Sequence, residues 1–327
     1  MSDNKNGECP DVRSAPKPLV SLLVPVYNEE DTIGIFIEKV YEVLNHDDIF
    51  FNVIFVDDGS KDNTLPLLVD FSNKYKNISI ISLSRNFGKE AALTAAIDYA
   101  DGDVLVPIDV DLQDPPELIK QFIEKWREGY DVVYGLRLTR ETDTATKRLT
   151  SGWFYNLFNK LSNIRIPENA GDFRLIDRKV ANSIKLLPER SRFMKGLFSW
   201  VGFKSIGVPY SRPSRVAGST KWNYWKLWNF ALDGITGFST VPIRMWSYVG
   251  ALISIFSFLY AAMIVVKVII FGIDVPGYAS LLTAVLFFGG VQLLSIGIIG
   301  EYVGRLYVEI KGRPIYIVDK QYLAEKS

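Results

Sequence analysis

Two uncharged runs near the end of the chain limit its fold more than any other feature. Tyr248–Val266 holds 19 residues without a charge, and Val275–Gly300 holds 26. At about 1.5 Å per residue, a helix of either length crosses a hydrocarbon core of roughly 30 Å. Because the linker between the runs is short and turn-like, the sequence predicts a hairpin of two transmembrane helices within residues 244–304. Two buried core helices are the alternative.

The charges beside this hairpin predict its orientation. Arg244 precedes the first run, Arg305 and Lys311 follow the second, and the linker carries no positive charge. Because positive residues collect on the cytoplasmic side, the large N-terminal part and the tail 305–327 are expected in the cytoplasm. Lys267 lies near the far end of its run, where a long side chain can reach the opposite interface.

Regularly spaced tryptophans stand just before the hairpin. Trp222, Trp225 and Trp228 recur every three residues, with lysines beside them. Aromatic side chains with basic neighbours are typical of membrane–water interfaces. The sequence therefore predicts interfacial amphipathic helices over residues 221–243, with a core helix as the alternative.

The start of the chain has a different composition. Residues 1–17 are polar and contain no apolar run, so a disordered tail is predicted. Cys9 is the only cysteine, which excludes a disulfide framework within the chain. His46, the only histidine, lies in a polar stretch and is expected in a surface loop rather than at a metal.

Between the tail and the tryptophans, residues 18–220 alternate short apolar runs with amphipathic segments. Strand-like runs cover 19–26, 53–56, 78–83, 104–108 and 131–134, and helical spacing covers 32–44, 65–71, 88–100, 114–127 and 144–161. Asp114, followed by two prolines, is interpreted as the cap of the 114–127 helix. This alternation predicts an α/β domain with a mostly parallel sheet, whose ligands bind beyond the carboxyl ends of the strands.

Three acidic motifs follow three of these strands. They are Pro25-Val26-Tyr27-Asn28-Glu29, Asp57-Asp58-Gly59-Ser60 and Asp109-Val110-Asp111-Leu112-Gln113-Asp114-Pro115-Pro116-Glu117. Strand ends of a parallel sheet converge, and gathered carboxylates repel each other unless a cation lies among them. Oxygen ligands suit Mg²⁺ or Mn²⁺. The motifs together therefore predict a metal-bound nucleotide.

In this order the motifs resemble those of family 2 glycosyltransferases with the A-type fold, in the branch that acts on polyprenyl phosphates. The similarity covers roughly residues 19–224, and Ser84–Lys89 and Gly171–Arg174 also match that branch. The hairpin resembles that of the GtrB-type bactoprenol glucosyltransferases. The resemblance implies a Rossmann-like, mostly parallel catalytic domain over 18–220, followed by interfacial helices and the transmembrane hairpin.

The resemblance also implies roles for individual residues. The nucleotide would be held by Pro25, Tyr27, Glu29, Asp58, Lys89 and Asp109. The metal, Mg²⁺ or Mn²⁺, would be held by Asp109, Asp111 and Gln113. The catalytic set would be Asp109, Asp111 and Asp172. Asp172 stands where related chains often have serine, so its use as a base is left open.

The acceptor side is expected in the basic middle of the chain. Residues 137–226 carry 18 Lys or Arg against 6 Asp or Glu, whereas residues 1–136 carry 12 against 25. The acceptor phosphate would be met by Arg137, Arg148, Arg174 and Arg215. A phosphate monoester is largely dianionic at neutral pH and is already a nucleophile, so direct displacement with inversion is expected.

These points favour transfer of a hexose, with UDP-glucose as donor and undecaprenyl phosphate as acceptor, at the cytoplasmic face of the bacterial inner membrane. A GDP-mannose-dependent mannosyltransferase is the close alternative, because the motifs do not separate the bases. A processive polysaccharide synthase, a transporter and a scaffold are weaker alternatives. No nucleic-acid partner is expected. Glycines in the hairpin allow close helix packing, so a homo-oligomer is predicted, with a tetramer as one form.

Overall fold

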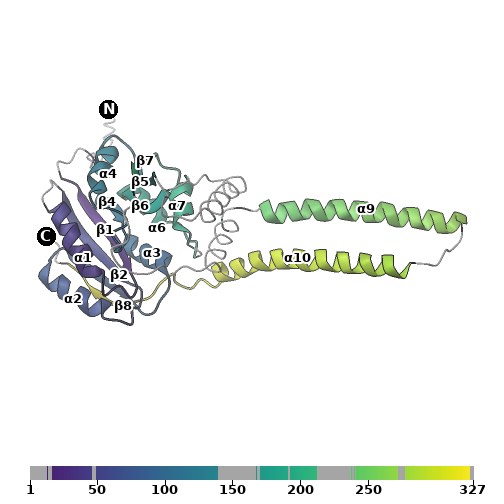
Figure 1. Ribbon diagram of the computed structural model, residues 1–327, viewed down its shortest axis with the longest axis horizontal. Helices are drawn as coiled ribbons and strands as arrows, with labels where there is room; N and C mark the ends of the chain where they lie inside the picture. Colours follow the sequence, from purple (N-terminus) through teal and green to yellow (C-terminus); the bar gives the residue numbers. More distant parts are fainter. Residues whose placement is uncertain are drawn as a thin grey trace, which may run out of the picture.

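The computed structural model describes residues 13, 17–45, 49–138, 167, 170–190, 192–211, 237, 239, 241–271 and 277–324. The predicted helix 144–161, Arg148, Arg215 and the three interfacial tryptophans lie outside these residues, as does His46. An α/β domain bears two long helices that project from one side of it (Figure 1).

The domain is built on one eight-stranded sheet with the order β7-β5-β6-β4-β1-β2-β3-β8. The strands are β1 (Leu19–Val26), β2 (Phe50–Asp57), β3 (Ile78–Leu83), β4 (Val104–Pro107), β5 (Val132–Arg137), β6 (Ala170–Asp177), β7 (Ser205–Tyr210) and β8 (Val318–Tyr322). The strands β1 to β4 run parallel, as do β5 and β7, whereas β6 and β8 are antiparallel to their neighbours. The predicted mostly parallel sheet is confirmed.

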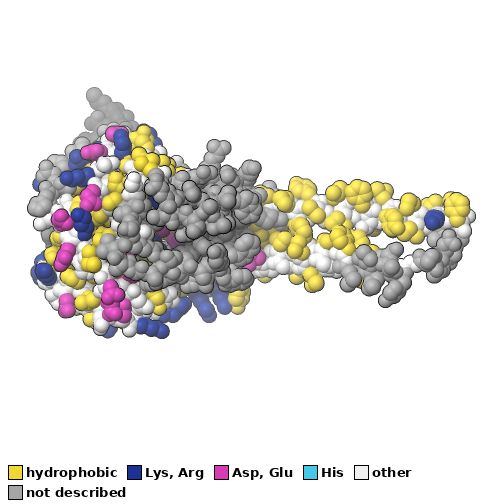
Figure 2. Space-filling model, in the orientation of Figure 1, with side chains coloured by type: hydrophobic (Ala, Val, Ile, Leu, Met, Phe, Trp, Pro, Cys, Tyr) yellow, Lys and Arg dark blue, Asp and Glu magenta, His cyan; other side chains and the backbone are white. Residues whose placement is uncertain are grey.

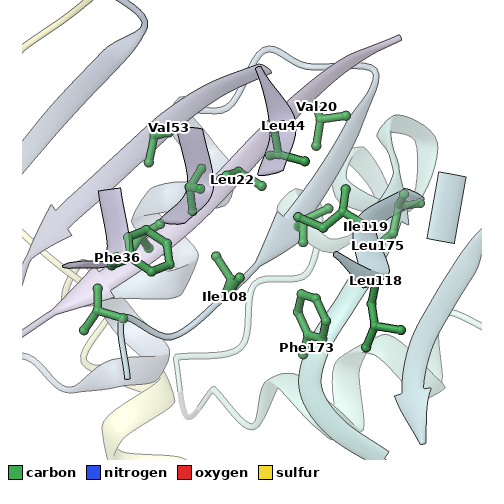
Figure 3. Packing of buried hydrophobic residues seen from close by; sticks show 14 of the residues in the cluster. Val20, Leu22, Phe36, Leu44, Val53, Ile108, Leu118, Ile119, Phe173 and Leu175 are labelled. Carbon is green, nitrogen blue, oxygen red and sulfur yellow. The ribbon is translucent and has the colours of Figure 1, made fainter. Parts of the chain in front are cut away.

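Helices cover both faces of this sheet. They are α1 (Ile33–Leu44), α2 (Thr64–Lys74), α3 (Lys89–Tyr99), α4 (Leu118–Arg127), α6 (Arg178–Lys185) and α7 (Met194–Trp200). Consecutive residues of β1 point to opposite faces, so Leu22 packs with α1, α2 and α4, and Leu23 packs with α3, α6 and α7. Figure 3 shows Leu22, Phe36 and Phe173 in the first of these two cores. Apolar packing on both faces fixes where the strand ends lie.

The predicted cap of α4 is wrong. The helix begins at Leu118 with Glu117 at the cap position, and no side chain caps it. Asp114 is buried, and its carboxylate accepts a hydrogen bond from the Tyr210 hydroxyl at 2.7 Å. An Asp-Pro-Pro sequence suits a cap locally, but here a partner from β7 takes the carboxylate.

Arg13, which lies in the predicted disordered tail, contacts the folded domain. Its guanidinium pairs with the carboxylates of Asp131 and Asp177 and lies 5.9 Å from the centre of the Trp126 ring. These partners lie in α4 and beside β5 and β6, so the residue is attached to the folded domain.

Two apolar helices, α9 (Val241–Phe271) and α10 (Tyr278–Ile310), follow the domain. Each contains a 24-residue segment long and apolar enough to cross a membrane, none of it buried in the structure. Figure 2 shows the apolar side chains along them in yellow. The Trp246 indole donates to the Ser295 hydroxyl, and the Tyr302 hydroxyl donates to the Ser239 carbonyl at 2.8 Å. Antiparallel neighbours of this kind form the predicted hairpin.

The end of the hairpin is attached to the domain. The expected tail 305–327 begins inside α10, which ends at Ile310, and it then supplies β8 at the edge of the sheet. The backbone N–H of Arg190 donates to the Glu309 carboxylate at 2.9 Å, and the Tyr316 hydroxyl donates to Asp98 at 2.8 Å. The tail is therefore partly structured, and it links α10 to the α3 side of the sheet.

Candidate active site

A small crevice opens at the carboxyl ends of the central strands. It is lined by Pro25, Lys89, Leu93, Pro107, Ile108, Asp109, Asp114, Asp172 and Phe173. The first and third acidic motifs meet here, together with residues from the start of α3 and from β6. This is the position at which a parallel α/β sheet binds its ligands.

The first two motifs are joined by hydrogen bonds. The Lys61 N–H donates to the Asn28 side chain at 2.8 Å, and the Glu29 N–H donates to Thr64 at 2.8 Å. Asn28 has a φ of 53°, in the left-handed region that asparagine tolerates better than most residues. The turn after β1 is thus held against the turn after β2, and Tyr27 and Glu29 lie in it, partly exposed.

Asp58 has a structural task that the sequence did not reveal. Its carboxylate accepts the backbone N–H groups of Phe87 at 2.7 Å and of Gly88 at 2.9 Å. A Cβ on Gly59 would lie 2.6 Å from the carbonyl carbon of Arg85, so only glycine permits this approach. Burial raises the pKa of Asp58, although the two backbone donors oppose the rise. The loop that starts α3 is fixed in this way beside the crevice.

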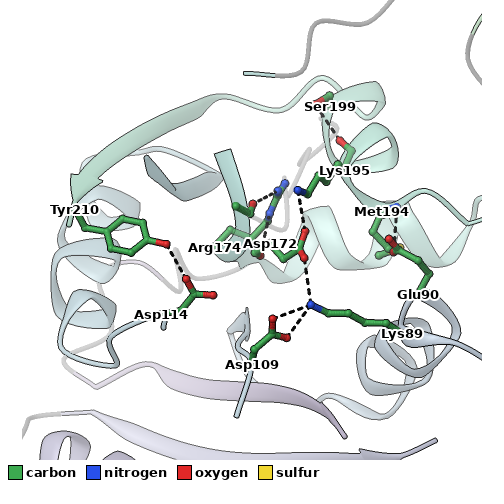
Figure 4. A network of polar contacts seen from close by, with 11 residues as sticks. Lys89, Glu90, Asp109, Asp114, Asp172, Arg174, Met194, Lys195, Ser199 and Tyr210 are labelled. Carbon is green, nitrogen blue, oxygen red and sulfur yellow. Dashed lines mark hydrogen bonds and ion pairs between the residues drawn. The ribbon is translucent and has the colours of Figure 1, made fainter. Parts of the chain in front are cut away.

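A chain of alternating charges crosses the crevice (Figure 4). The Lys89 ammonium lies 2.8 Å from the Asp109 carboxylate and 3.2 Å from that of Asp172. Lys195, from α7, lies 3.5 Å from the other oxygen of Asp172. The side chains of Lys89 and Asp172 are each 42% exposed, so water and ligands reach them. Two cationic groups and two carboxylates are thus gathered at one open position.

This pairing fixes the protonation of Asp172. Burial raises its pKa, but Lys195 and Lys89 outweigh burial and hold the pKa of Asp172 well below its usual range. For Lys89, burial lowers the pKa, and the carboxylates of Asp109 and Asp172 raise it further than burial lowers it. A carboxylate so strongly held in its ionised form is a poor proton acceptor near neutral pH.

At the position where the sequence predicts gathered carboxylates, Asp109 is paired with Lys89. Among the described residues, no three Asp, Glu, His or Cys side chains form a group that could hold a metal ion. Asp111 and Gln113 follow on a turn in which Leu112 has a φ of 54° and the Gln113 N–H donates to Asp111 at 3.2 Å. The oxygen donors of Asp109, Asp111 and Gln113 suit Mg²⁺ or Mn²⁺ as a partial set that a diphosphate would complete.

Two of the predicted acceptor arginines, Arg137 and Arg174, are among the described residues, and Arg137 lies beside the crevice. It ends β5 beside Tyr210 of β7, and its Nη2 atom lies beside Gly171, the residue before Asp172. Arg174 is buried, and it donates to the carbonyls of Gly171 at 2.8 Å and Asp172 at 3.3 Å. Arg174 therefore shapes the backbone that carries Asp172, and its contact with a phosphate stays a prediction.

Three residues of the site were not predicted in these roles. Lys195 and Tyr210 come from α7 and β7, neither of which has a strong apolar pattern, and no motif surrounds them in the sequence. Glu90 is next to the predicted Lys89, and its carboxylate accepts the Met194 N–H at 3.3 Å. The only signal in the sequence for a role of Glu90 was its position directly after the Ser84–Lys89 segment.

Comparison with known proteins places these features in a family. The model "Glycosyl transferase family 2" matches residues 21–185, and the model "GtrB C-terminal hairpin" matches residues 241–306. The first match runs from β1 through α6, so it includes the crevice and every strand except β7 and β8. The second covers α9 and most of α10.

Full-length relatives agree with both matches. An uncharacterized glycosyltransferase of Synechocystis is 54% identical over 91% of this chain and 94% of its own. A prophage-derived bactoprenol glucosyl transferase of Shigella flexneri is 50% identical over 93% of this chain and 98% of its own. A prophage bactoprenol glucosyl transferase homolog of Escherichia coli is 50% identical over 92% and 98%.

Proposed function

Because the chain belongs to the family 2 glycosyltransferases and carries a GtrB-type C-terminal hairpin, we propose that it transfers glucose from UDP-glucose to undecaprenyl phosphate. Relatives named bactoprenol glucosyl transferases are 50% identical over nearly their whole length and support this choice of donor and acceptor. The structural observation that carries the proposal is the ion-pair chain Asp109–Lys89–Asp172–Lys195. It brings ammonium groups to an open crevice of a membrane-associated protein, where two phosphate groups must meet.

The donor is assigned to the β1–β4 side of the crevice. Pro25 and Asp109 line the crevice, and the turn with Tyr27 and Glu29 adjoins it, held to the turn after β2. A nucleotide bound across these turns would place its diphosphate near Lys89. Asp109, Asp111 and Gln113 would hold a Mg²⁺ or Mn²⁺ ion there, which when bound would stabilise the negative charge of the departing diphosphate.

The acceptor is assigned to the side of β5, β6 and α7. Its phosphate would be neutralised by Arg137 and Lys195, whose charges are near Asp172. Arginine's planar fork suits a phosphate, and a lysine adds a mobile positive charge. The phosphate dianion attacks the anomeric carbon directly, so the product has the inverted configuration and no protein base removes a proton.

The position of α7 fits an acceptor that arrives from the membrane. Figure 1 shows α7 on the side of the domain from which α9 and α10 project. Arg190, shortly before α7, donates its N–H to Glu309 near the end of α10. The catalytic domain and both termini would lie in the cytoplasm, with Lys267 near the opposite interface. The homo-oligomer expected from the hairpin glycines stays a prediction.

The test is a donor panel with the full-length protein in lipid vesicles. Radiolabelled UDP-glucose, UDP-galactose and GDP-mannose are each incubated with undecaprenyl phosphate and Mg²⁺, and the lipids are extracted. Label from UDP-glucose should enter the lipid fraction and depend on added undecaprenyl phosphate. Transfer from GDP-mannose alone would refute the donor, and no lipid-linked label from any donor would refute the acceptor.

A further inference from the structure

Three side chains from distant parts of the sequence form a buried polar chain beside the crevice. The Tyr210 hydroxyl, at the end of β7, donates to the Asp114 carboxylate at 2.7 Å. Arg137, at the end of β5, is the register partner of Tyr210 on β7, and its guanidinium interacts with the Tyr210 hydroxyl. Asp114 is 2% exposed and Tyr210 is 5% exposed. One hydroxyl thus joins a buried carboxylate to a guanidinium.

The backbone around this chain is shaped to admit it. A Cβ on Gly135 would lie 2.7 Å from the Tyr210 ring, and a Cβ on Gly171 would lie 3.0 Å from the Arg137 Nη2 atom. Packing alone does not require the hydroxyl, because a phenylalanine ring would fill the same space beside Phe173. Burying a hydroxyl and a carboxylate is unfavourable unless both are hydrogen bonded. Core packing therefore does not explain why a hydroxyl and a carboxylate occupy these positions.

The guanidinium at the end of the chain is incompletely satisfied. The Nε atom of Arg137 is buried and has no hydrogen-bond partner in the part of the chain that the structure describes. The Nη2 atom of Arg137 lies beside Gly171, whose chain neighbour is Asp172, so the guanidinium is close to the ion-pair chain. An anion bound there would meet a guanidinium with a donor still to be used.

We propose that Tyr210 is a positioning residue, which holds the Arg137 guanidinium toward the acceptor phosphate by linking it to Asp114. This inference rests on the proposed function, since it names the acceptor phosphate as the anion. Burial, and after it Asp114, raises the pKa of Tyr210 to about 12, so the hydroxyl keeps its proton during any assay near neutral pH. The Tyr210 hydroxyl therefore continues to donate to the Asp114 carboxylate.

The first test is Tyr210→Phe in the full-length protein, with UDP-glucose and undecaprenyl phosphate varied separately. Loss of the hydroxyl beside the guanidinium should raise the KM for undecaprenyl phosphate roughly three- to tenfold and leave the KM for UDP-glucose within about twofold. Tyr41→Phe is the matched control. It also removes a partly buried hydroxyl, which bonds to Asn77 away from the crevice, so it should lower the Tm without changing either KM.

The second test shows whether Tyr210 acts through Arg137. If it does, adding Tyr210→Phe to Arg137→Ala should cause less than a twofold further rise in the acceptor KM. Equal effects of Tyr210→Phe in both backgrounds, or equal rises in both KM values, would overturn the positioning role. Asp114→Asn removes the carboxylate charge that holds the Tyr210 hydroxyl, and it serves where Tyr210→Phe fails to fold. It should also raise the acceptor KM alone. Failure of the wild-type protein to label the lipid refutes the proposed function instead, before any variant is compared.

Discussion

The two halves of the sheet build their parts of the site in different ways. On the β1–β4 half, backbone groups of neighbouring turns hold the site, as when Asp58 accepts the N–H groups of Phe87 and Gly88. On the β6-β5-β7 half, side chains hold side chains across large sequence separations, as in the contacts of Lys195 with Asp172 and of Tyr210 with Asp114. The donor half is thus fixed by the fold itself, whereas the acceptor half depends on a few charged groups. Substitutions in the two halves should therefore affect donor binding and acceptor binding separately.

The largest effect is expected on the donor half, from Asp111→Asn. The substitution removes a charged metal ligand, so transfer should fall on the order of a hundredfold or more, and UDP-glucose binding should weaken as well. EDTA should abolish the activity of the wild-type protein. Calorimetric titration with UDP-glucose, with and without Mg²⁺, gives a second readout. Full activity in EDTA would contradict the metal assignment.

Arg137→Ala should show the opposite pattern, on the acceptor half. Loss of one charge-assisted contact should lower transfer about ten- to a hundredfold, through the acceptor KM. Binding of UDP-glucose should stay unchanged, because Arg137 ends β5, on the side of the crevice assigned to the acceptor. Arg127→Ala, at the exposed end of α4, is the control and should retain full activity. If Arg137→Ala instead loses nucleotide binding, the two phosphate positions must be exchanged.

Asp172→Asn tests how the two halves are joined, because Asp172 bridges Lys89 and Lys195. Without its charge both ammonium groups lose a partner, so transfer should fall about three- to tenfold. Measurable activity should remain, since the phosphate needs no base. Initial rates at saturating donor and acceptor give the comparison. Activity as low as that of Asp111→Asn, with both substrates still bound, would show that Asp172 is the base.

The same contrast explains what the sequence could predict. The strands at 19–26 and 78–83 were placed to the residue, because continuous apolar runs reflect burial on both faces. The convergence of the strand-end turns followed from parallel topology alone. The hairpin also followed from local composition, and both of its helices were expected.

What the sequence did not predict depends on partners that are distant in the chain. Strand β8, Val318–Tyr322, is mostly polar and exists because β3 offers an edge to pair with. Asp114 looked like a cap because its real partner, Tyr210, is 96 residues away. Lys195 has no motif of its own, and its role appears only when α7 is placed beside Asp172. Local pattern cannot encode such pairings.

The smallest expected effect concerns Glu90, which lies where α3 meets α7. Burial and then the charge of Asp172 raise the pKa of Glu90 to about 7, while Lys89 opposes the rise. The unfolded chain loses this proton near the ordinary glutamate pKa, so between that pH and about 7 the folded state binds more protons. Stability therefore falls as pH rises through this window, and the loss is complete above it.

The Glu90→Gln variant has no proton to lose in this pH range, and its side chain still accepts from the Met194 N–H. Glu90 is only partly buried, so the effect should be small. The Tm of the Glu90→Gln variant should exceed that of the wild type by about 2 °C at pH 8 and match it at pH 4.5. Scanning fluorimetry at the two pH values measures this, with Glu124→Gln on the exposed face of α4 as the control. An equal Tm difference at both pH values would mean that Glu90 is ionised throughout, and that the junction of α3 and α7 tolerates its charge.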